Sequence, residues 1–65
     1  MLITFNGEQM DTTSITVREL LDDHGVDGRG VAVAVNGAIV PRSQWSESTL
    51  REGAVVEVVT AAAGG

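Results

Sequence analysis

Hydrophobic and polar residues alternate at the start of the chain. Residues 2–5 combine β-formers with a period of two, which predicts a strand. Asn6-Gly7 follows, and this dipeptide is typical of a two-residue hairpin turn. Residues 8–12 are therefore predicted to return as a second strand.

A helix start follows this predicted hairpin. Thr16 and Glu19 have the spacing of a capping box, in which the Thr16 hydroxyl accepts from the Glu19 amide and the Glu19 side chain reaches back to Thr16. Ile15, just before the cap, is expected to pack on Leu20 as a hydrophobic staple.

The predicted helix ends within a few residues. Gly25 suits the left-handed position that closes a helix, and Val26 beyond it is expected to contact Leu21. We therefore predict a helix over residues 17–24, which is too short to be stable alone and must dock on a sheet. Its buried face is expected to hold Val17, Leu20 and Leu21.

The second half repeats the hairpin pattern. Residues 31–35 alternate valine and alanine and predict a third strand. Asn36-Gly37 is a second hairpin signal, and residues 39–40 form a short return strand that Pro41 ends.

The remaining segments connect or complete the sheet. Residues 27–30 are glycine-rich and are interpreted as a flexible connection, whereas residues 43–49 are expected to form a loop or a single helical turn. Gly53 marks a turn, and residues 55–59 predict the last strand.

Two hairpins that flank one helix, followed by a final strand, predict an α+β domain. One helix on one face of a mixed sheet of four to five strands, joined by a right-handed crossover, is the ubiquitin-like β-grasp arrangement. We expect this domain to span residues 1–60, with residues 61–65 as a flexible tail. The inward positions are expected to be Ile3, Phe5, Leu20, Leu21, Val33, Val35, Leu50, Val56 and Val58.

The opposite face of the sheet is also expected to be apolar. A contiguous apolar patch on one side of a sheet suggests a protein interface, although its continuity depends on the strand register. The residues expected on this face are Leu2, Ala32, Ala34, Val55 and Val59.

Composition excludes several function classes. The chain has 65 residues, no cysteine and a formal net charge of −5, so disulfides and thiolate metal sites are excluded. The negative charge argues against nucleic acid and against an anionic membrane surface as partners, and a basic protein partner is more plausible. We find neither a signal peptide nor a long apolar run, so a cytoplasmic protein is expected.

The chain is poor in groups that could form an active site or a metal site. The single histidine, His24, lies at the predicted helix end, where its protonated ring would meet the negative end of the helix dipole. Asp22, Asp23 and Asp27 could only form a metal site with it if consecutive helix residues converged, so we expect no metal. No catalytic residue, nucleophile or phosphate-binding loop is expected.

Trp45 is the only tryptophan. We expect it to pack as a lid over the sheet edge with its indole partly wet, and the alternative is an interface anchor. Together with Arg42, it completes the set of residues that we consider as a partner surface.

The sharpest signal is the terminal pair Gly64-Gly65 after three alanines. Five residues beyond Thr60 can extend about 17 Å, and a backbone without Cβ atoms beyond Ala63 can enter a channel too narrow for side chains. Those are the requirements of a carboxylate that another enzyme must reach.

The fold order and the terminal Gly-Gly resemble the ubiquitin-like superfamily. The stretch from Val35 to Arg42 (Val-Asn-Gly-Ala-Ile-Val-Pro-Arg), with Trp45 three residues on, resembles the central stretch of the ThiS sulfur-carrier family, and the similarity runs the whole chain. Ala54 departs from the pattern, since many relatives carry an aspartate there.

This resemblance implies a carrier and not an enzyme. An adenylyltransferase of the ThiF type would use ATP to adenylate the carboxylate of Gly65, and a persulfide protein would supply the sulfur of a thiocarboxylate. The thiazole synthase ThiG would take that sulfur for thiamin, and the carrier itself would bind no cofactor. The alternatives are a carrier for molybdopterin or cysteine synthesis, as in MoaD, and a non-catalytic β-grasp interaction module.

Overall fold

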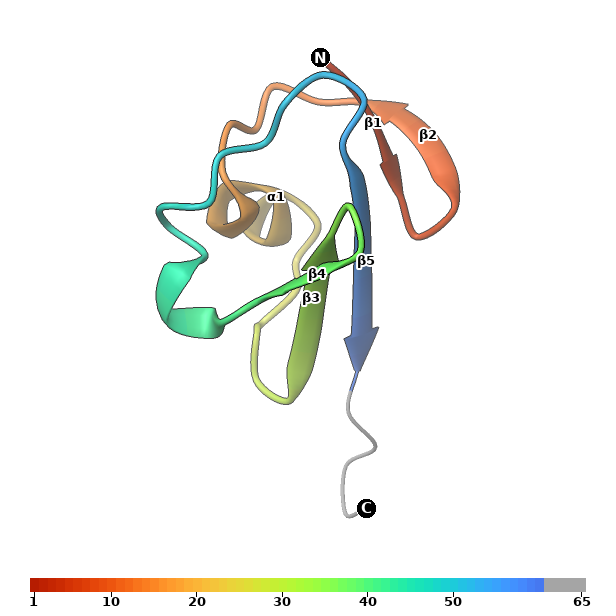
Figure 1. Cartoon of the computed structure of the whole chain (residues 1–65). Helices are drawn as coiled ribbons and strands as arrows, with labels where there is room; N and C mark the ends of the chain where they lie inside the picture. The colour runs from red at the N-terminus through yellow and green to blue at the C-terminus, as the bar shows by residue number, and fades with distance from the viewer. Residues whose placement is uncertain (61–65) are drawn as a thin grey trace.

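The computed structural model describes residues 1–60, which form one mixed sheet with a helix on one face (Figure 1). The flexible tail predicted over residues 61–65 lies outside the described residues. Among residues 1–60, no helix is long and apolar enough to cross a membrane. The elements in chain order are β1 (Leu2–Phe5), β2 (Glu8–Asp11), α1 (Val17–Asp23), β3 (Val31–Val35), β4 (Ala38–Val40), the 3₁₀ turn η1 (Arg42–Gln44) and β5 (Val55–Thr60).

The strands lie in the order β2-β1-β5-β3-β4, so that the last strand occupies the centre of the sheet. β5 runs parallel to β1 and antiparallel to β3, and each hairpin adds one antiparallel edge strand. The described residues therefore have the predicted β-grasp architecture. The element bounds differ from the prediction by one residue at several ends, where hydrogen bonding stops gradually.

Both predicted hairpin turns are confirmed. Asn6 and Gly7 have φ angles of 50° and 86°, and Asn36 and Gly37 have 52° and 85°. Positive φ at both central residues matches the twist of the flanking strands, and asparagine and glycine tolerate that conformation best. The Asn-Gly pairs therefore set the register of both hairpins.

The predicted helix start is only partly confirmed. The Thr16 hydroxyl accepts from the Glu19 amide at 3.2 Å, but the Glu19 carboxylate accepts from the amide of Ile15 and not from that of Thr16. The expected staple is wrong, because Ile15 is 57% exposed while Leu20 is buried. The Ile15 carbonyl instead accepts from the amide of Leu50, so this residue is fixed through its backbone.

The helix ends as predicted. Gly25 has a φ of 69°, its amide donates to the carbonyl of Asp22, and the Val26 amide donates to that of Leu21. These two bonds form a Schellman motif. His24 caps the helix, its Nδ1 lies 2.9 Å from the Leu20 carbonyl oxygen, and its ring stacks on Phe5 at 4.5 Å.

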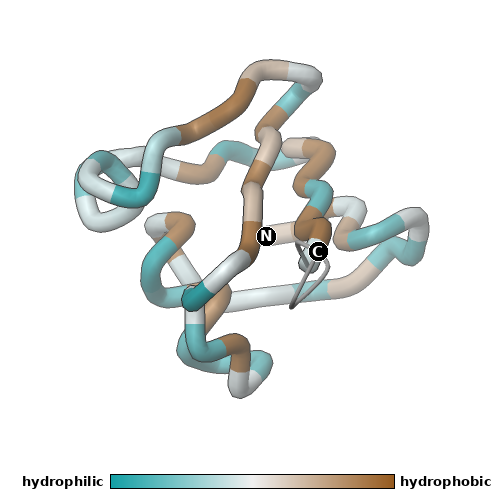
Figure 2. Tube along the Cα trace, turned by 90° about the horizontal axis from the view of Figure 1, so that it is seen from below, coloured by the Kyte–Doolittle hydropathy of each residue, from teal (hydrophilic) through white to brown (hydrophobic). Residues whose placement is uncertain are grey.

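The hydrophobic core lies between the helix and the sheet. Hydrophobic and polar stretches alternate along the chain in Figure 2, as expected for elements buried on one face. Of the predicted inward positions, Phe5, Val35 and Val58 are half-buried against the core and the others are fully buried. The buried hydrophobic residues are Ile3, Val17, Leu20, Leu21, Val33, Trp45, Leu50, Ala54 and Val56.

Candidate functional site

β5 is the element that leads to the predicted tail. Its last residue, Thr60, pairs with Val31 at the start of β3. The predicted site residues Ala63, Gly64 and Gly65 lie outside the described residues, so the structure defines the base of the tail and its surroundings.

The two hairpin asparagines hold β5 from both sides. The Asn36 side-chain oxygen accepts from the Val55 amide at 2.9 Å, and the Asn6 side-chain oxygen accepts from the Val58 amide at 2.8 Å. Their own amides donate to the carbonyl oxygens of Val55 and Val56. The turn residues of both hairpins thus extend the pairing of the central strand, a role that sequence pattern alone did not suggest.

The outer face of the sheet carries the predicted apolar residues, but they are not contiguous. Val59 pairs with Ala32 close to the end of β5, and Val55 pairs with Thr4 at the other end of the strand. Between them Glu57 lies opposite Ala34, so a carboxylate interrupts the row. The continuity that the sequence analysis left open is therefore absent, because the register places a charge at the centre of the row.

The apolar part near the end of β5 includes one residue that the sequence analysis missed. Ile39 pairs with Ala34 and is 68% exposed, and Val59 is 63% exposed. The alternation of β4 could have indicated this, since Ile39 lies between two positions that face the other side. We call Ala32, Ala34, Ile39 and Val59 the outer apolar patch.

Trp45 is not a surface residue. It is 1% exposed, and its Nε1 donates to the Val40 carbonyl oxygen at 2.9 Å. The expectation of a partly wet lid, and its assignment to the partner surface, are therefore corrected. The 3₁₀ turn η1 leads the chain back from β4 over the helix side of the sheet, which inserts the indole into the core.

The glycine-rich connection is fixed by this tryptophan. Gly28 is buried with a φ of 90°, and a Cβ added there would lie 2.9 Å from Cζ3 of Trp45. The connection is thus packed closely against Trp45 at Gly28, where the expectation of a simple flexible connection is wrong. Only glycine meets both the conformational and the spatial requirement.

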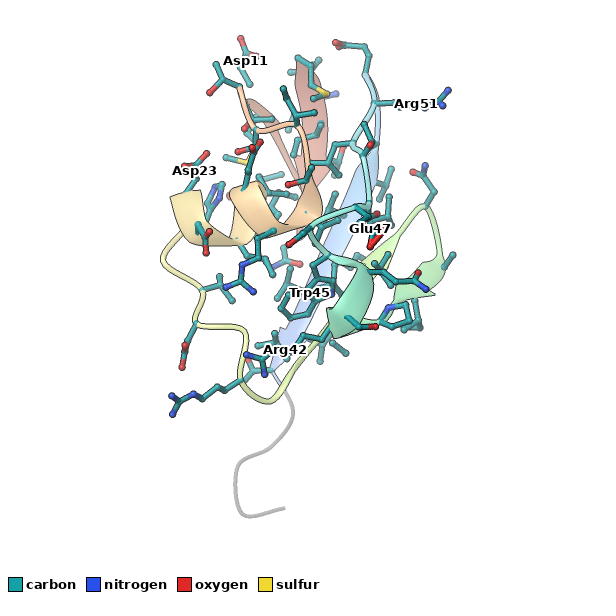
Figure 3. The ribbon with its side chains drawn as sticks, turned by 90° about the vertical axis from the view of Figure 1, so that its left-hand side faces the viewer. Asp11, Asp23, Arg42, Trp45, Glu47 and Arg51 are labelled. Atoms are coloured by element: carbon teal, nitrogen blue, oxygen red, sulfur yellow. The ribbon has the colours of Figure 1, made fainter. Side chains whose placement is uncertain are left out.

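Arginine side chains cover the tryptophan ring. The guanidinium carbons of Arg18 and Arg42 lie 5.7 and 5.9 Å from the ring centroid, within the range of cation–π contacts. Figure 3 shows Arg42 beside Trp45 on the helix side of the sheet. The predicted partner set is therefore divided by the sheet: its apolar members lie on the outer face, and Arg42 lies on the helix side.

The remaining polar features lie away from the end of β5. A surface groove of about 430 Å³ runs between β2 and the end of α1, and it is lined by Met10, Asp11, Thr12, Thr13, Asp23 and His24. At its rim the Met1 amino group lies 3.0 Å from Asp11 Oδ1, and its hydrogen bond and positive charge lower the pKa of the Asp11 carboxyl group. Among residues 1–60, no three histidine or acidic side chains converge as metal ligands would.

Comparison with known proteins agrees with this geometry. The ThiS family model matches residues 3–65 of the chain. Over its whole length the chain is 36% identical to the sulfur carrier protein ThiS of Escherichia coli, all of which is covered. It also superimposes, with a TM-score of 0.86 and 29% identity over all of both chains, on a crystal structure of the thiamine biosynthesis protein ThiS from Geobacter metallireducens.

A further relative is a longer protein. The chain is 39% identical over 66 aligned residues to a thiazole synthase of Paramagnetospirillum magneticum, and it spans about a fifth (20%) of that protein's length.

Proposed function

The chain belongs to the ThiS family of sulfur carrier proteins, and from that membership we propose that its sulfur is carried as a thiocarboxylate on Gly65. As a member of this family it is a sulfur carrier for thiamine biosynthesis and not an enzyme. This decides between the alternatives that the terminal Gly-Gly left open, namely a molybdopterin or cysteine pathway and a simple interaction module.

The proposed chemistry begins at the carboxylate of Gly65. A carboxylate oxygen attacks the α-phosphorus of ATP on the activating enzyme, and pyrophosphate leaves. The terminal sulfur of a persulfide then attacks the acyl carbon and expels AMP, and a thiol cleaves the resulting sulfur–sulfur bond to leave the thiocarboxylate. The carrier supplies no catalytic group, because activation and transfer occur on its partners.

One observation carries the proposal: the family match extends through Gly64 and Gly65. The described part of the chain supports it, since β5 is the central strand. It pairs with β3 as far as Thr60, and on its other side β1 and Asn6 hold it as far as Val58. A rigid strand fixes the direction in which the next residues leave the domain. Gly64 and Ala63 would then give the narrow backbone that an enclosed site requires.

The partners belong to thiazole synthesis, as the thiazole synthase relative that contains a matching segment implies. We assign three of them: a ThiF-type adenylyltransferase that consumes ATP, a persulfide protein that donates sulfur, and the thiazole synthase ThiG. The outer apolar patch is the docking face that we assign, because Val59 is exposed near the end of β5 and Ile39 is exposed on the same face, at the level of Glu57.

The test is an intact mass after incubation with ATP, a ThiF-type enzyme and a sulfur source. Replacement of one oxygen by sulfur is expected, and alkylation must map the adduct to Gly65, because oxidation of Met1 or Met10 adds nearly the same mass. Protein lacking Gly65 is the control, and Gly65→Ala is expected to slow transfer sharply with unchanged thermal unfolding. An unmodified chain, with an enzyme active on another carrier, contradicts the proposal.

A further inference from the structure

A basic cluster lies on the helix side of this acidic chain. The guanidinium groups of Arg18 and Arg42 share the buried ring of Trp45, at 5.7 and 5.9 Å from its centroid. The negative ring face offsets part of the repulsion between the two cations, so the indole can hold both in one place. The net charge of the chain is −5, so two guanidinium groups on one ring are an exception to its acidic character.

Ion pairing separates the four arginines into two groups. Arg18 pairs with Asp22 at 3.3 Å, and Arg29 pairs with Asp27 at 3.6 Å. Within residues 1–60, neither Arg42 nor Arg51 has a carboxylate within 4 Å. Arg42 is thus a positive charge that the described part of the chain holds in place without neutralising.

The cluster lies near the end of β5. Gly28 contacts both Trp45 and Arg18, since a Cβ added there would lie 2.9 Å from the indole and 3.8 Å from Nη1 of Arg18. Three residues further along the chain, Val31 pairs with Thr60. Figure 3 shows Arg42 at the end of the molecule where β5 ends and Arg51 toward the opposite end.

We propose that Arg42, supported by Trp45 and Arg18, docks on carboxylates at the surface of the activating enzyme and orients the end of β5 toward its site. This inference rests on the proposed function. A guanidinium matches a carboxylate in bidentate geometry, and one that already rests on an indole loses less freedom on binding. Gly65 follows Thr60 by five residues, which can span at most about 17 Å. The docking contact at Arg42 is thus distinct from the carboxylate that is modified.

The activating enzyme is the partner that needs such a contact most. At this step a chain of net charge −5 brings an anionic carboxylate to a site that holds ATP, so like charges meet. A cationic contact beside the end of β5 offsets that repulsion and selects one orientation among many, because charge complementarity acts mainly on encounter rate and register.

The experiment compares Arg42→Glu with Arg51→Glu. Both variants change the net charge equally, and both start from an arginine without an ion pair among residues 1–60. The association rate with a ThiF-type enzyme is measured by stopped flow at several salt concentrations. Arg42→Glu is expected to slow association about tenfold at low salt, with the difference vanishing at high salt, and Arg51→Glu by less than about twofold. Equal slowing by both variants overturns the inference.

Arg42→Lys and Arg42→Gln test whether the effect of Arg42 on the association rate comes from its charge or from its packing. Both variants keep an apolar stem next to Trp45. Lysine is expected to retain most of the association rate and glutamine to lose much of it, with thermal unfolding of both close to wild type. Equal loss in the two variants, in step with a lower unfolding midpoint, overturns the inference.

The two proposals fail in different ways. Wild-type protein that forms no thiocarboxylate contradicts the proposed function. Normal modification of the wild type, with equal association rates for Arg42→Glu and Arg51→Glu, contradicts only the docking role.

Discussion

The two sides of the sheet use their hydrophobic residues differently. On the helix side Trp45 is buried, its indole nitrogen is hydrogen-bonded to Val40, and Gly28 fits against its ring. On the outer side Val59 and Ile39 are exposed, with small alanines between them. The hydrophobic residues of the helix side therefore carry most of the stability of this small domain, whereas those of the outer side are exposed to partners. Substitutions of hydrophobic residues on the helix side should therefore change the free energy of unfolding, and those on the outer side should change affinity for a partner.

The largest effect is expected from Trp45→Ala. Removing a buried tryptophan costs about 3–5 kcal/mol, which approaches the whole stability of a small domain, so much of the protein should be unfolded at 25 °C. Urea denaturation followed by circular dichroism measures this loss. Trp45→Phe is the control and should lose less, because it keeps an aromatic ring but not the hydrogen bond to Val40. A loss below about 1 kcal/mol for Trp45→Ala would show that the helix side does not depend on this residue.

Gly28→Ala should come next, at about 1–3 kcal/mol. The new Cβ meets both an unfavourable φ of 90° and the indole at 2.9 Å. Gly30→Ala is the matched control, since Gly30 also has a positive φ but nothing lies within 4 Å of its added Cβ. Equal unfolding midpoints for the two variants would mean that the contact with Trp45 costs nothing.

Val59→Thr should separate stability from binding. It keeps a β-branched side chain on the exposed face, so the free energy of unfolding should change by less than about 0.5 kcal/mol, while affinity for the activating enzyme falls about tenfold. Val58→Thr is the matched control, because Val58 is half-buried against the core and a hydroxyl placed there should cost stability. Calorimetric titration and thermal unfolding measure the two effects. Unchanged affinity in Val59→Thr would remove the outer apolar patch as a docking face.

The smallest effect concerns Asp11, the last residue of the edge strand β2. Its pKa is lowered in the folded state by the Met1 amino group, so the pair adds stability above the unfolded pKa and loses it as pH falls through the folded pKa. The difference in unfolding midpoint between wild type and Asp11→Asn should therefore be present at pH 6 and shrink toward pH 2. A difference that grows on acidification would have the wrong sign for this ion pair.

Turn and cap chemistry was largely predictable from the sequence, whereas the staple at Ile15 and the burial of Trp45 were not. The Asn-Gly turns, the Thr16 cap and the Gly25 helix end each depend on a few neighbouring residues, and each lies where the sequence pattern predicts it. The burial of Trp45 depends on how residues 42–50 return over the helix side, and no local pattern encodes that path.

The candidate site shows the same contrast between local patterns and contacts of distant segments. The outer face was assigned correctly by alternation, but its continuity required the register between β3 and β5, which places Glu57 opposite Ala34. Ile39 was missed although the alternation of β4 places it on the outer face, opposite Ala34. The assignment of Gly64 and Gly65 remains a prediction from sequence and family membership, outside the described residues.

The central position of β5 has a mechanical consequence. A partner that bound the residues beyond Thr60 and pulled on them would apply force along this strand. Because β1 and β3 flank β5 and their hydrogen bonds run across its axis, a pull along the strand loads those bonds together in shear and does not open them one at a time. Asn6 and Asn36 add side-chain bonds to the same loaded strand. The domain can thus resist a pull at the end of β5 without first losing its edge strands, β2 and β4.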